Sequence, residues 1–512
     1  MKPNFLDRLI GEWNPRAGAE RLAWRAEMEM RTHYDAADSG RLQSRWTAIN
    51  EIAEFTDAFD RDIVRARARD LERNSDIQNS VIRAFRRNVV GTGIHVRVTV
   101  QDHKIAEQIE AIWKMWCKAK NCDVTGTQSF SEILRMCIQR KVVDGGYIIL
   151  KRYTNHGIIP FQLQVLEVDD LDTGAISPKY KGNRVIGGVE LNSYNRPVGY
   201  WLKQYTLDGY GIQDSKFFEA KDVIFKFSKK RPTQVREMSD MSPAITRVKD
   251  ANEFMNAVTV KEKIAACFAA FIKRQNPAVP SSFSSRNAQG ARPQDITYAG
   301  KRIVPGMIME LNVGDEPVFA NPNGAAADAS GFTKQLQRMI SSGQGLSYEA
   351  TSRDMSDTTY SSARQSLIED DLTYAEEREL LEAVMDEIYE TFVISCWLAQ
   401  KFNAPDFWQK KEVYFQHEWV VEPRRWIDPQ KEAGANRTAL QSGQKTFQQT
   451  CSEYGRDWKK VIDEMAEAIQ YADGKGIDLS SIIYDPKSTG SELNEKGAAN
   501  GKAGNTDQNA DT

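Results

Sequence analysis

The spacing of hydrophobic side chains changes from a helical period to a period of two within the first half of the chain. After a glycine break, apolar and polar residues alternate over 94–100, which predicts a strand. Steps of three and four predict helices over residues 60–90, 105–118 and 130–143. From residue 145 to 227 the period is two in short runs, and these predict a mainly antiparallel β region over 147–150, 161–165, 185–191, 198–205 and 223–227.

The third quarter of the chain predicts two helices on either side of a small β unit. Ser242 is suited to cap the first helix, with Pro243 in its first turn, and the apolar spacing continues to Arg274. Thirty residues in a helix measure about 45 Å. A connection rich in Pro, Ser and Asn leads to β structure over 296–319, and a second helix is predicted over 329–342.

A polar loop over residues 343–360 precedes the longest helical pattern. A capping box of Ser362 and Gln365 is expected to open this helix, which continues to Phe402 and measures about 60 Å. Shorter helices are predicted over 429–443 and 458–471, and the polar end of the chain, 487–512, is predicted to be disordered. The fold class expected from these elements is α+β.

Composition narrows the classes of protein that fit this pattern. The 512 residues include 68 Lys and Arg against 71 Asp and Glu, a net charge of −3, and 41% are hydrophobic. These values are ordinary for a globular protein and exclude a strongly basic nucleic-acid clamp. Residues 61–90 hold eight arginines against four acids, and residues 361–390 hold ten acids against two arginines. The basic stretch is interpreted either as a solvated helix face or as a contact with nucleic acid or a partner.

The chain lacks the common catalytic motifs. Its six cysteines form no CxxC pair, no P-loop or GxSxG elbow occurs, and no apolar stretch is long enough to cross a membrane. Gly91 and Gly93 lack the third glycine of a dinucleotide-binding turn. Two acid clusters, Asp169-Asp170-Asp172 and Glu369-Asp370-Asp371, could bind Mg²⁺ but are interpreted as surface charge, because no Lys or His spacing accompanies them. We therefore predict a soluble cytoplasmic protein with no catalytic residue, metal or cofactor.

Four motifs, in one order along the chain, resemble the lambda family of tailed-bacteriophage portal proteins. The most specific is Tyr360-Ser361-Ser362-Ala363-Arg364, which follows a loop containing Gly345 to Glu349 and Asp354. The others are Asn88 to Ile94, with Gly91 and Gly93; Arg231 to Arg236, with Gln234; and Asp428 to Ala433. The resemblance extends from about residue 60 to 475. It departs from the family pattern at Glu237, where a glycine is common.

The resemblance implies a ring, typically of twelve subunits, at the unique vertex of a capsid. Such a ring admits double-stranded DNA during packaging and releases it at ejection. Its partners would be further copies of itself, the terminase large subunit, head-completion and tail connector proteins, the capsid and a scaffold protein, with no membrane. The protein would be made in the cytoplasm of the bacterial host and function in the virion without being an enzyme.

The resemblance also implies a division of the chain into parts. They are an N-terminal segment, an α/β wing, a stem helix, a clip containing β structure, a second stem helix, a channel loop, a long wing helix with its return, a helical crown and a disordered tail. These parts occupy residues 1–60, 61–241, 242–275, 276–328, 329–343, 344–360, 361–427, 428–485 and 486–512, respectively.

A DNA conduit needs only sparse cations, because a wall that pairs many phosphates gains affinity with each contact and would hinder movement. We hypothesise that Lys334 and Arg338 on the second stem helix, and Arg353 on the channel loop, make transient phosphate contacts. The alternative is that these residues form ordinary ion pairs within or between subunits. Two other functions are kept open: a metal-dependent nuclease using Asp169, Asp170 and Asp172, and a virion structural protein other than a portal.

Overall fold

The computed structural model describes residues 9–10, 12–31, 50–206, 212–266, 270–274, 315–319, 329–421, 429–454, 456 and 458–477. Helices and strands both contribute, as the α+β prediction requires. The chain divides into two compact units. The N-terminal unit comprises Met1–Asp60 with Arg231–Gln234, and the main unit comprises Arg61–Lys230 with Val235–Thr512.

Hydrogen bonds to Ala53, Glu51 and Thr56 attach the segment Arg231–Gln234 to the rest of the N-terminal unit. The Thr233 hydroxyl accepts from the Ala53 amide at 3.0 Å, and the Arg231 guanidinium donates to the Glu51 carbonyl at 2.6 Å. This unit contains α2 (Pro15–Arg31), which the sequence did not predict, and the first residues of α3 (Ala53–Asn74).

The predicted helices of the first half are present, and side-chain caps start them. Ser75 caps α4 (Asp76–Phe85), and the Asp102 carboxylate caps α5 (His103–Trp116). A capping box of Ser129 and Glu132 opens α7 (Phe130–Asp144). These caps satisfy amides that have no partner within the helix. A π-helix, η2 (Arg86–Val90), continues α4, and α6 (Ala119–Cys122) is a single turn.

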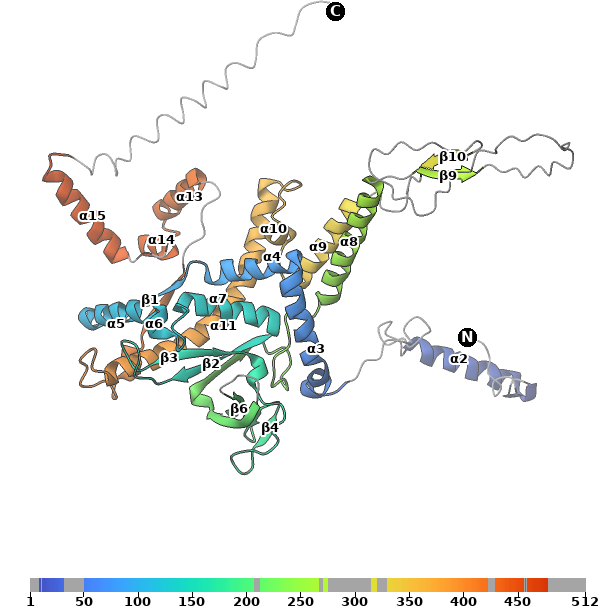
Figure 1. Ribbon diagram of the computed structural model, residues 1–512, viewed down its shortest axis with the longest axis horizontal. Coiled ribbons are helices and arrows are strands. Elements are labelled where there is room, and N and C mark those ends of the chain that lie inside the picture. Colours follow the sequence, from blue (N-terminus) through green and yellow to red (C-terminus); the bar gives the residue numbers. More distant parts are fainter. Residues whose placement is uncertain are drawn as a thin grey trace, which may run out of the picture. The chain divides into compact units, whose positions relative to one another are not determined.

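Two antiparallel sheets form the β region (Figure 1). The first has the order β3–β2–β8, with β2 (Gly146–Arg152) paired on both edges. The second is a meander in which β6 (Pro197–Tyr205) pairs with both β5 and β7. The remaining strands of these sheets are β3 (Gln162–Leu166), β4 (Arg184–Ile186), β5 (Val189–Leu191), β7 (Ile212–Glu219) and β8 (Val223–Phe227). The antiparallel prediction is confirmed, and β7 is an addition to it. The single strand predicted over 185–191 is wrong: Gly187 and Gly188, both with positive φ, form a turn that divides it into the paired strands β4 and β5.

A third sheet joins distant parts of the chain. β1 (Ile94–Val98) pairs antiparallel with β11 (His417–Val421), with Val96 opposite Trp419. The alternation over 94–100 predicted β1, but nothing local in the sequence indicates a partner more than 300 residues away. Because both strands pack on the helices of the main unit, this pairing fixes the return of the chain after the longest helix.

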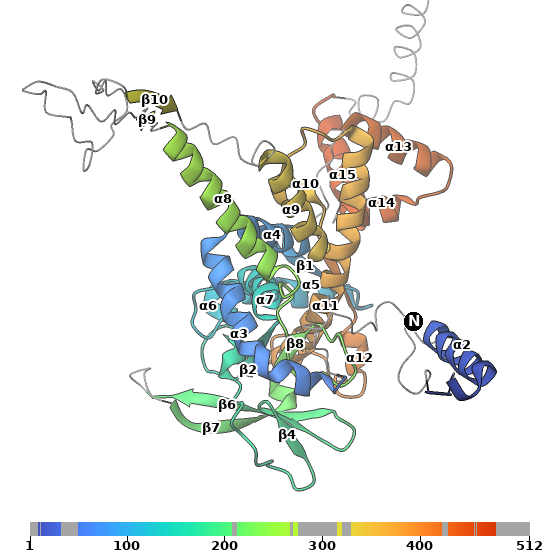
Figure 2. The same cartoon turned by 90° about the vertical axis from the view of Figure 1, so that its right-hand side faces the viewer.

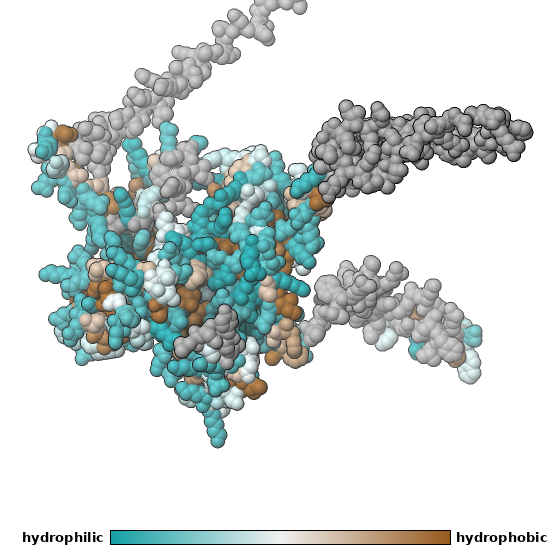
Figure 3. All heavy atoms as spheres, viewed as in Figure 1, coloured by the Kyte–Doolittle hydropathy of each residue, from teal (hydrophilic) through white to brown (hydrophobic). Residues whose placement is uncertain are grey.

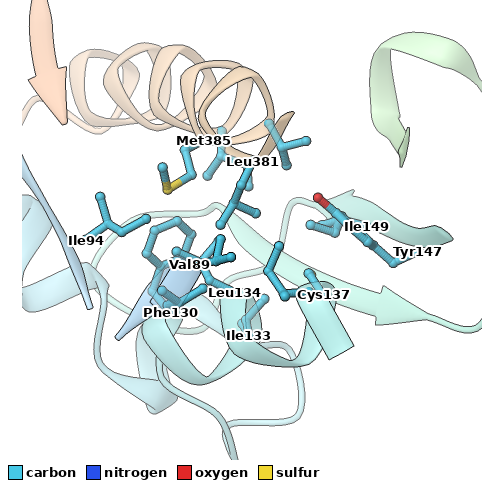
Figure 4. Packing of buried hydrophobic residues seen from close by; sticks show 14 of the residues in the cluster. Val89, Ile94, Phe130, Ile133, Leu134, Cys137, Tyr147, Ile149, Leu381 and Met385 are labelled. Carbon is cyan, nitrogen blue, oxygen red and sulfur yellow. The ribbon is translucent and has the colours of Figure 1, made fainter. Parts of the chain in front are cut away.

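The longest helix, α11 (Tyr360–Leu398), packs the second half of its length into the main core. Figure 4 shows Leu381 and Met385 of α11 above Val89, Phe130 and Leu134. Aromatic rings extend this core: Trp116 and Phe161 stack in parallel with centroids 5.5 Å apart, and the Trp116 indole N–H donates to the Phe161 carbonyl at 2.8 Å. The first half of α11 leaves Ile368 and Leu372 exposed.

The capping of α11 differs from the prediction. Thr359 is the N-cap, and Ser362 is the reciprocal partner in the box, so the helix starts earlier than expected. It ends at Leu398 instead of Phe402, because Gln400 adopts a left-handed φ of 53° and the Lys401 amide donates to the Cys396 carbonyl.

The two predicted stem helices are α8 (Ile245–Ala266) and α9 (Ala329–Gly343), which lie side by side in Figures 1 and 2. The rings of Phe254 and Phe332 meet edge to face at 4.8 Å, which joins the two helices. In place of the helix predicted from Ser242 to Arg274, α8 begins after turns that include Ser242.

The predicted C-terminal end of this helix, at Arg274, is also wrong, because α8 ends at Ala266. Residues 270–274 form β9 (Ala270–Arg274), which pairs antiparallel with β10 (Asp315–Phe319). The pairing supplies backbone partners that local spacing does not reveal, and Phe and Ile favour strands as well as buried helices. Of the predicted clip, only residues 315–319 lie among the described residues, and the predicted tail lies wholly outside them.

The remaining helices follow α9 and α11 along the chain. The predicted polar loop contains α10 (Tyr348–Ser352), and the predicted helices over 429–443 and 458–471 are α13 (Pro429–Gln441) and α15 (Trp458–Asp473). The sequence did not predict α12 (Lys411–Tyr414) or α14 (Phe447–Glu453). Hydrophilic residues dominate the visible face in Figure 3, interrupted by separate hydrophobic patches. Among the described residues, no helix is both long and apolar enough to span a bilayer.

Candidate functional site

The cations predicted to contact DNA lie around the ring of Tyr348. Lys334 and Arg338 are four residues apart on α9, so they share one face of the helix. Both charged groups lie 5.5 Å from the centre of the Tyr348 ring, which begins α10. These cation–π contacts hold α10 against α9.

Lys334 is paired within the chain. Its ammonium bonds the Asp357 carboxylate and lies 3.5 Å from Asp354. The hydrogen bond to Asp357 raises the pKa of Lys334. Hydrogen bonds from Ser356 and Tyr348 hold the pKa of Asp354 below its usual range. The geometry favours the ion-pair interpretation for Lys334, whose charge is compensated locally.

Arg338 and Arg353 differ from Lys334 because both are exposed. Arg353 ends α10 with a left-handed φ of 59°, and its amide donates to the Glu349 carbonyl at 3.0 Å. It lines a cavity of about 200 Å³ together with residues of η2 and α11, among them Arg87 and Asp370. Two of the three predicted cations are therefore presented to solvent, one on α9 and one at the end of α10.

The segment predicted as a channel loop is held by hydrogen bonds on several sides. Ser347 caps α10, and the buried Asp370 carboxylate of α11 accepts from the Ser347 amide at 2.7 Å and from its hydroxyl at 2.6 Å. The hydroxyls of Ser341 and Thr351 lie 2.6 Å apart, and Ser80 of α4 donates to the Thr351 carbonyl. Asp370, considered in the sequence as a possible Mg²⁺ ligand, instead anchors α10.

The motif at the start of α11 divides into structural and exposed positions. The Ser362 hydroxyl accepts from the Thr359 amide at 2.9 Å, so it belongs to the cap. The Tyr360 ring lies 5.3 Å from the ammonium of Lys431, which belongs to the Asp428 to Ala433 motif. Tyr360, Ser361, Ser362 and Arg364 are all exposed, and of these Ser361 and Arg364 take no part in the cap.

The glycine motif sets the turn from η2 into β1. Gly91 has a φ of 60°, which glycine adopts without strain. At Gly93 a side chain would come within 2.6 Å of the Ser131 hydroxyl at the start of α7. The Arg135 guanidinium fixes the turn by donating to the carbonyls of Gly91 and Thr92, each at 2.9 Å.

The Arg231–Arg236 motif ends in a buried ion-pair network. Arg236 is 1% exposed and donates to both oxygens of Glu237, at 2.8 and 3.0 Å. Glu237 is wholly buried and also accepts from the Arg65 guanidinium of α3 at 2.9 Å. The departure from the family pattern at Glu237 thus places a carboxylate between two guanidinium groups. Gln234 is buried too, and its backbone N–H donates to the Arg231 carbonyl at 3.0 Å.

The acid cluster Asp169-Asp170-Asp172, which suggested a nuclease, is connected to the same ion-pair network. Asp169 pairs with Arg69 at 2.6 Å and with Arg65 at 3.1 Å. Burial acts to raise the pKa of Asp169, but these two guanidinium groups lower it below its ordinary value. Asp170 and Asp172 accept hydrogen bonds from Tyr205 and from the Gly174 amide. In the described part of the chain no group of His, Cys, Asp and Glu is arranged to hold a metal ion.

Comparison with protein families shows which family the chain belongs to. A family model described as "Phage portal protein, lambda family" matches residues 39–378. The chain belongs to this family. The finding confirms the resemblance drawn from the sequence motifs.

Individual portal proteins resemble the chain over most of its length. It is 25% identical to a probable portal protein of Halomonas phage phiHAP-1, over 87% of this chain and 88% of that protein. It is 19% identical to portal protein B of Escherichia phage lambda, over 78% and 81%, and 20% identical to the portal protein of Escherichia phage N15, over 78% and 82%.

Similar solved structures come from gene transfer agent (GTA) particles. A chain of the virion of the native particle covers 75% of this chain and 89% of its own length, with 13% identity and a TM-score of 0.42. A chain of the neck of the native particle, computed with C12 symmetry, covers 74% and 90%, with 13% identity and a TM-score of 0.39.

Family membership assigns the protein to the virion. As a lambda-family portal protein it has a portal role at the capsid vertex, and the family is one of structural proteins, not of enzymes. In the polar clusters described above, Glu237 and Asp169 pair with arginines, and Asp370 binds Ser347, the N-cap of α10.

Proposed function

We propose that copies of this portal protein close into a ring that conducts double-stranded DNA into the capsid during packaging and out of it at ejection. The match of the lambda-family portal model to residues 39–378 is the observation that carries the proposal. Twelve subunits are the expected number. Rings close through heterologous interfaces, for which the exposed apolar side chains of the long helices are available.

The order of elements supports the division into wing, stem, clip and crown. α8 and α9 enclose the β9–β10 pair in the sequence, as two stem helices would enclose a clip. α11 follows as the long wing helix, and α13 to α15 would form the crown. The terminase large subunit is proposed to dock on residues 276–328. Head-completion and tail connector proteins, the capsid and a scaffold protein complete the proposed partners, and synthesis in the cytoplasm of the bacterial host is proposed with them.

Imaging of the purified protein by negative-stain electron microscopy tests the ring. We expect closed rings with a central hole, because a portal subunit completes its interfaces only in the ring. Incubation of the same sample with duplex DNA and Mg²⁺ tests the nuclease alternative, for which we expect no cleavage, since Asp169 is paired with two arginines. Monomers or open shells, or cleavage abolished by Asp169→Asn, would contradict the proposal.

Arg338 and Arg353 are the exposed cations that we propose contact DNA phosphates in transit. In Arg338→Gln/Arg353→Gln we expect the length of retained DNA to fall by about threefold or more, because each lost cation removes a phosphate contact. The measurement is the length of DNA in purified particles. Lys118→Gln/Lys120→Gln is the matched control, since it removes two exposed positive charges from the region around α6. Equal DNA lengths in the two double variants would reject the assignment.

A further inference from the structure

α15 has an apolar face that the described part of the chain leaves largely uncovered. Apolar side chains recur at steps of three and four along this helix and share one side of it. They belong to Trp458, Val461, Ile462, Met465, Ala468, Ile469 and Ala472. Within α15 only Ala472 is buried, and Ile462 is 45% exposed although α14 packs beside the helix. Because an amphipathic helix normally buries such a face, α15 lacks an occupant among the described residues.

The C-terminal end of α15 turns the chain back towards this face. The Ile477 amide donates to the Ala472 carbonyl at 3.0 Å, and the Gly476 amide donates to the Asp473 carbonyl at 3.0 Å. Gly476 has a left-handed φ of 77°. Together these features form a Schellman motif, in which the residue after the glycine commonly packs against the last turn of the helix. The chain therefore leaves α15 at the level of Ala472, the last residue of the apolar face.

The residues that follow the motif are apolar and have the length of the face. Residues 477–484 include Ile477, Leu479, Ile482, Ile483 and Tyr484. The face measures about 21 Å from Trp458 to Ala472 at 1.5 Å per helical residue. Eight extended residues span about 26 Å. One pass of this segment along α15 is therefore long enough to cover the whole face.

The covalent connection favours this segment over a separate molecule. A group joined by a short linker has an effective concentration in the millimolar range, whereas a second copy has to associate from solution. Ile477 is 53% exposed, so its side chain is available to begin the contact. A segment that runs back along the helix also brings Asp485 towards the exposed Lys459, where the helix dipole favours a negative charge.

We propose that residues 478–484 fold back along α15 and cover its apolar face within the same subunit. The isoleucines at 482 and 483 then replace solvent beside the first half of α15. While the segment is bound, this face is closed to a second copy and to other proteins. The proposal does not rest on the proposed ring, because every group named belongs to a single chain.

Hydrogen exchange of the full-length protein tests the proposal. In Ile482→Asp/Ile483→Asp we expect the amides of residues 462–472 to exchange at least tenfold faster, because two charged side chains cannot replace the apolar contacts. Ser488→Asp/Thr489→Asp is the matched control, since it adds the same charges beyond the segment, and its exchange should equal that of the unaltered protein. Exchange in the unaltered protein should also be the same at protein concentrations that differ tenfold, because the contact is intramolecular.

A peptide locates the contact on α15. The probe is a fluorescein-labelled peptide of residues 478–486, measured by fluorescence anisotropy. It should bind full-length Ile482→Asp/Ile483→Asp at least tenfold more tightly than the unaltered protein, in which the face is already covered. Adding Ile462→Asp should remove this binding. Adding Gln470→Asp, on the opposite side of the helix, should leave it unchanged.

Three results would overturn the proposal. One is unchanged exchange in Ile482→Asp/Ile483→Asp, or an equal effect of the control pair. Another is peptide binding that Ile462→Asp and Gln470→Asp alter equally, which would place the segment elsewhere. The last is protection of α15 that appears only as the protein concentration is raised, which would assign the face to a second copy of this chain.

Discussion

Glu237→Ala is expected to lower the free energy of unfolding of the main unit by roughly 3–5 kcal/mol, the usual cost of removing one partner from a buried ion pair. The Glu237 side chain is wholly buried and accepts hydrogen bonds from Arg65 and Arg236. Alanine would leave both guanidinium groups in the interior with reduced compensation, and burying an unpaired charge is costly. Denaturation in urea, followed by tryptophan fluorescence, measures the change.

Glu253→Ala is the matched control for this prediction. Glu253 pairs with Lys249 on α8 at 3.5 Å, and the two side chains are 64% and 68% exposed. Exposed pairs at this spacing contribute about 0.3–0.5 kcal/mol, so the urea midpoint should hardly change. The double variant Arg236→Met/Glu237→Leu should recover part of the loss, because it removes the guanidinium that donates to both Glu237 oxygens, while Arg65 keeps Asp62 and Asp169 as partners. Equal stability of Glu237→Ala and Glu253→Ala would show that the buried network contributes little.

Gly145→Ala should be the second severe substitution, with an expected loss of about 2–5 kcal/mol from left-handed strain and overpacking together. Gly145 ends α7 with a φ of 93° and leads directly into β2. An added Cβ would lie 2.3 Å from both the carbonyl carbon and the carbonyl oxygen of Met238. Because these are backbone atoms, the chain beside Glu237 would have to move.

Gly182→Ala separates the two causes of that loss. Gly182 has a nearly identical φ of 94°, but an added Cβ there has no neighbour within 4 Å. Its expected cost is the left-handed conformation alone, about 1–2 kcal/mol. Urea unfolding of the two variants gives the contribution of the close approach at Met238. If they lose the same free energy, the interior accommodates the methyl group and the steric argument is wrong.

Local sequence patterns predicted elements where one periodicity was long and its ends carried clear signals. α7 and α9 agree with their predicted ranges to within a residue or two. The strands of the two antiparallel sheets were predicted in their correct places except for β7, which was missed, and for residues 185–191, predicted as one strand and observed as β4 and β5. Predictions were wrong where a short segment fits a helix and a strand equally well. Residues 270–274 fit a buried helix as well as a strand, and pairing with β10 decided between them.

The sequence indicated which residues belong to the candidate site, but it did not indicate their ion-pair partners. The motifs drew attention to Tyr348 and to Arg236, and the hypothesis of a DNA conduit drew attention to the cations of α9. They did not reveal that Asp354 and Asp357 pair with Lys334, or that Arg65 shares the Glu237 carboxylate with Arg236. Arg65 and Glu237 are 172 residues apart. No periodic pattern specifies an ion pair over that separation.

The sequence by itself determined the order of helices and strands, the near balance of charge and the membership in the portal family, because these depend on residue types and on short-range spacing. The tertiary structure alone decided which charges are compensated and which backbone edges stay open. Arg353 is exposed while Lys334 is paired, and β1 has one partner strand among the described residues, β11. Both outcomes follow from contacts between segments far apart in the chain, where burial and geometry select the partner.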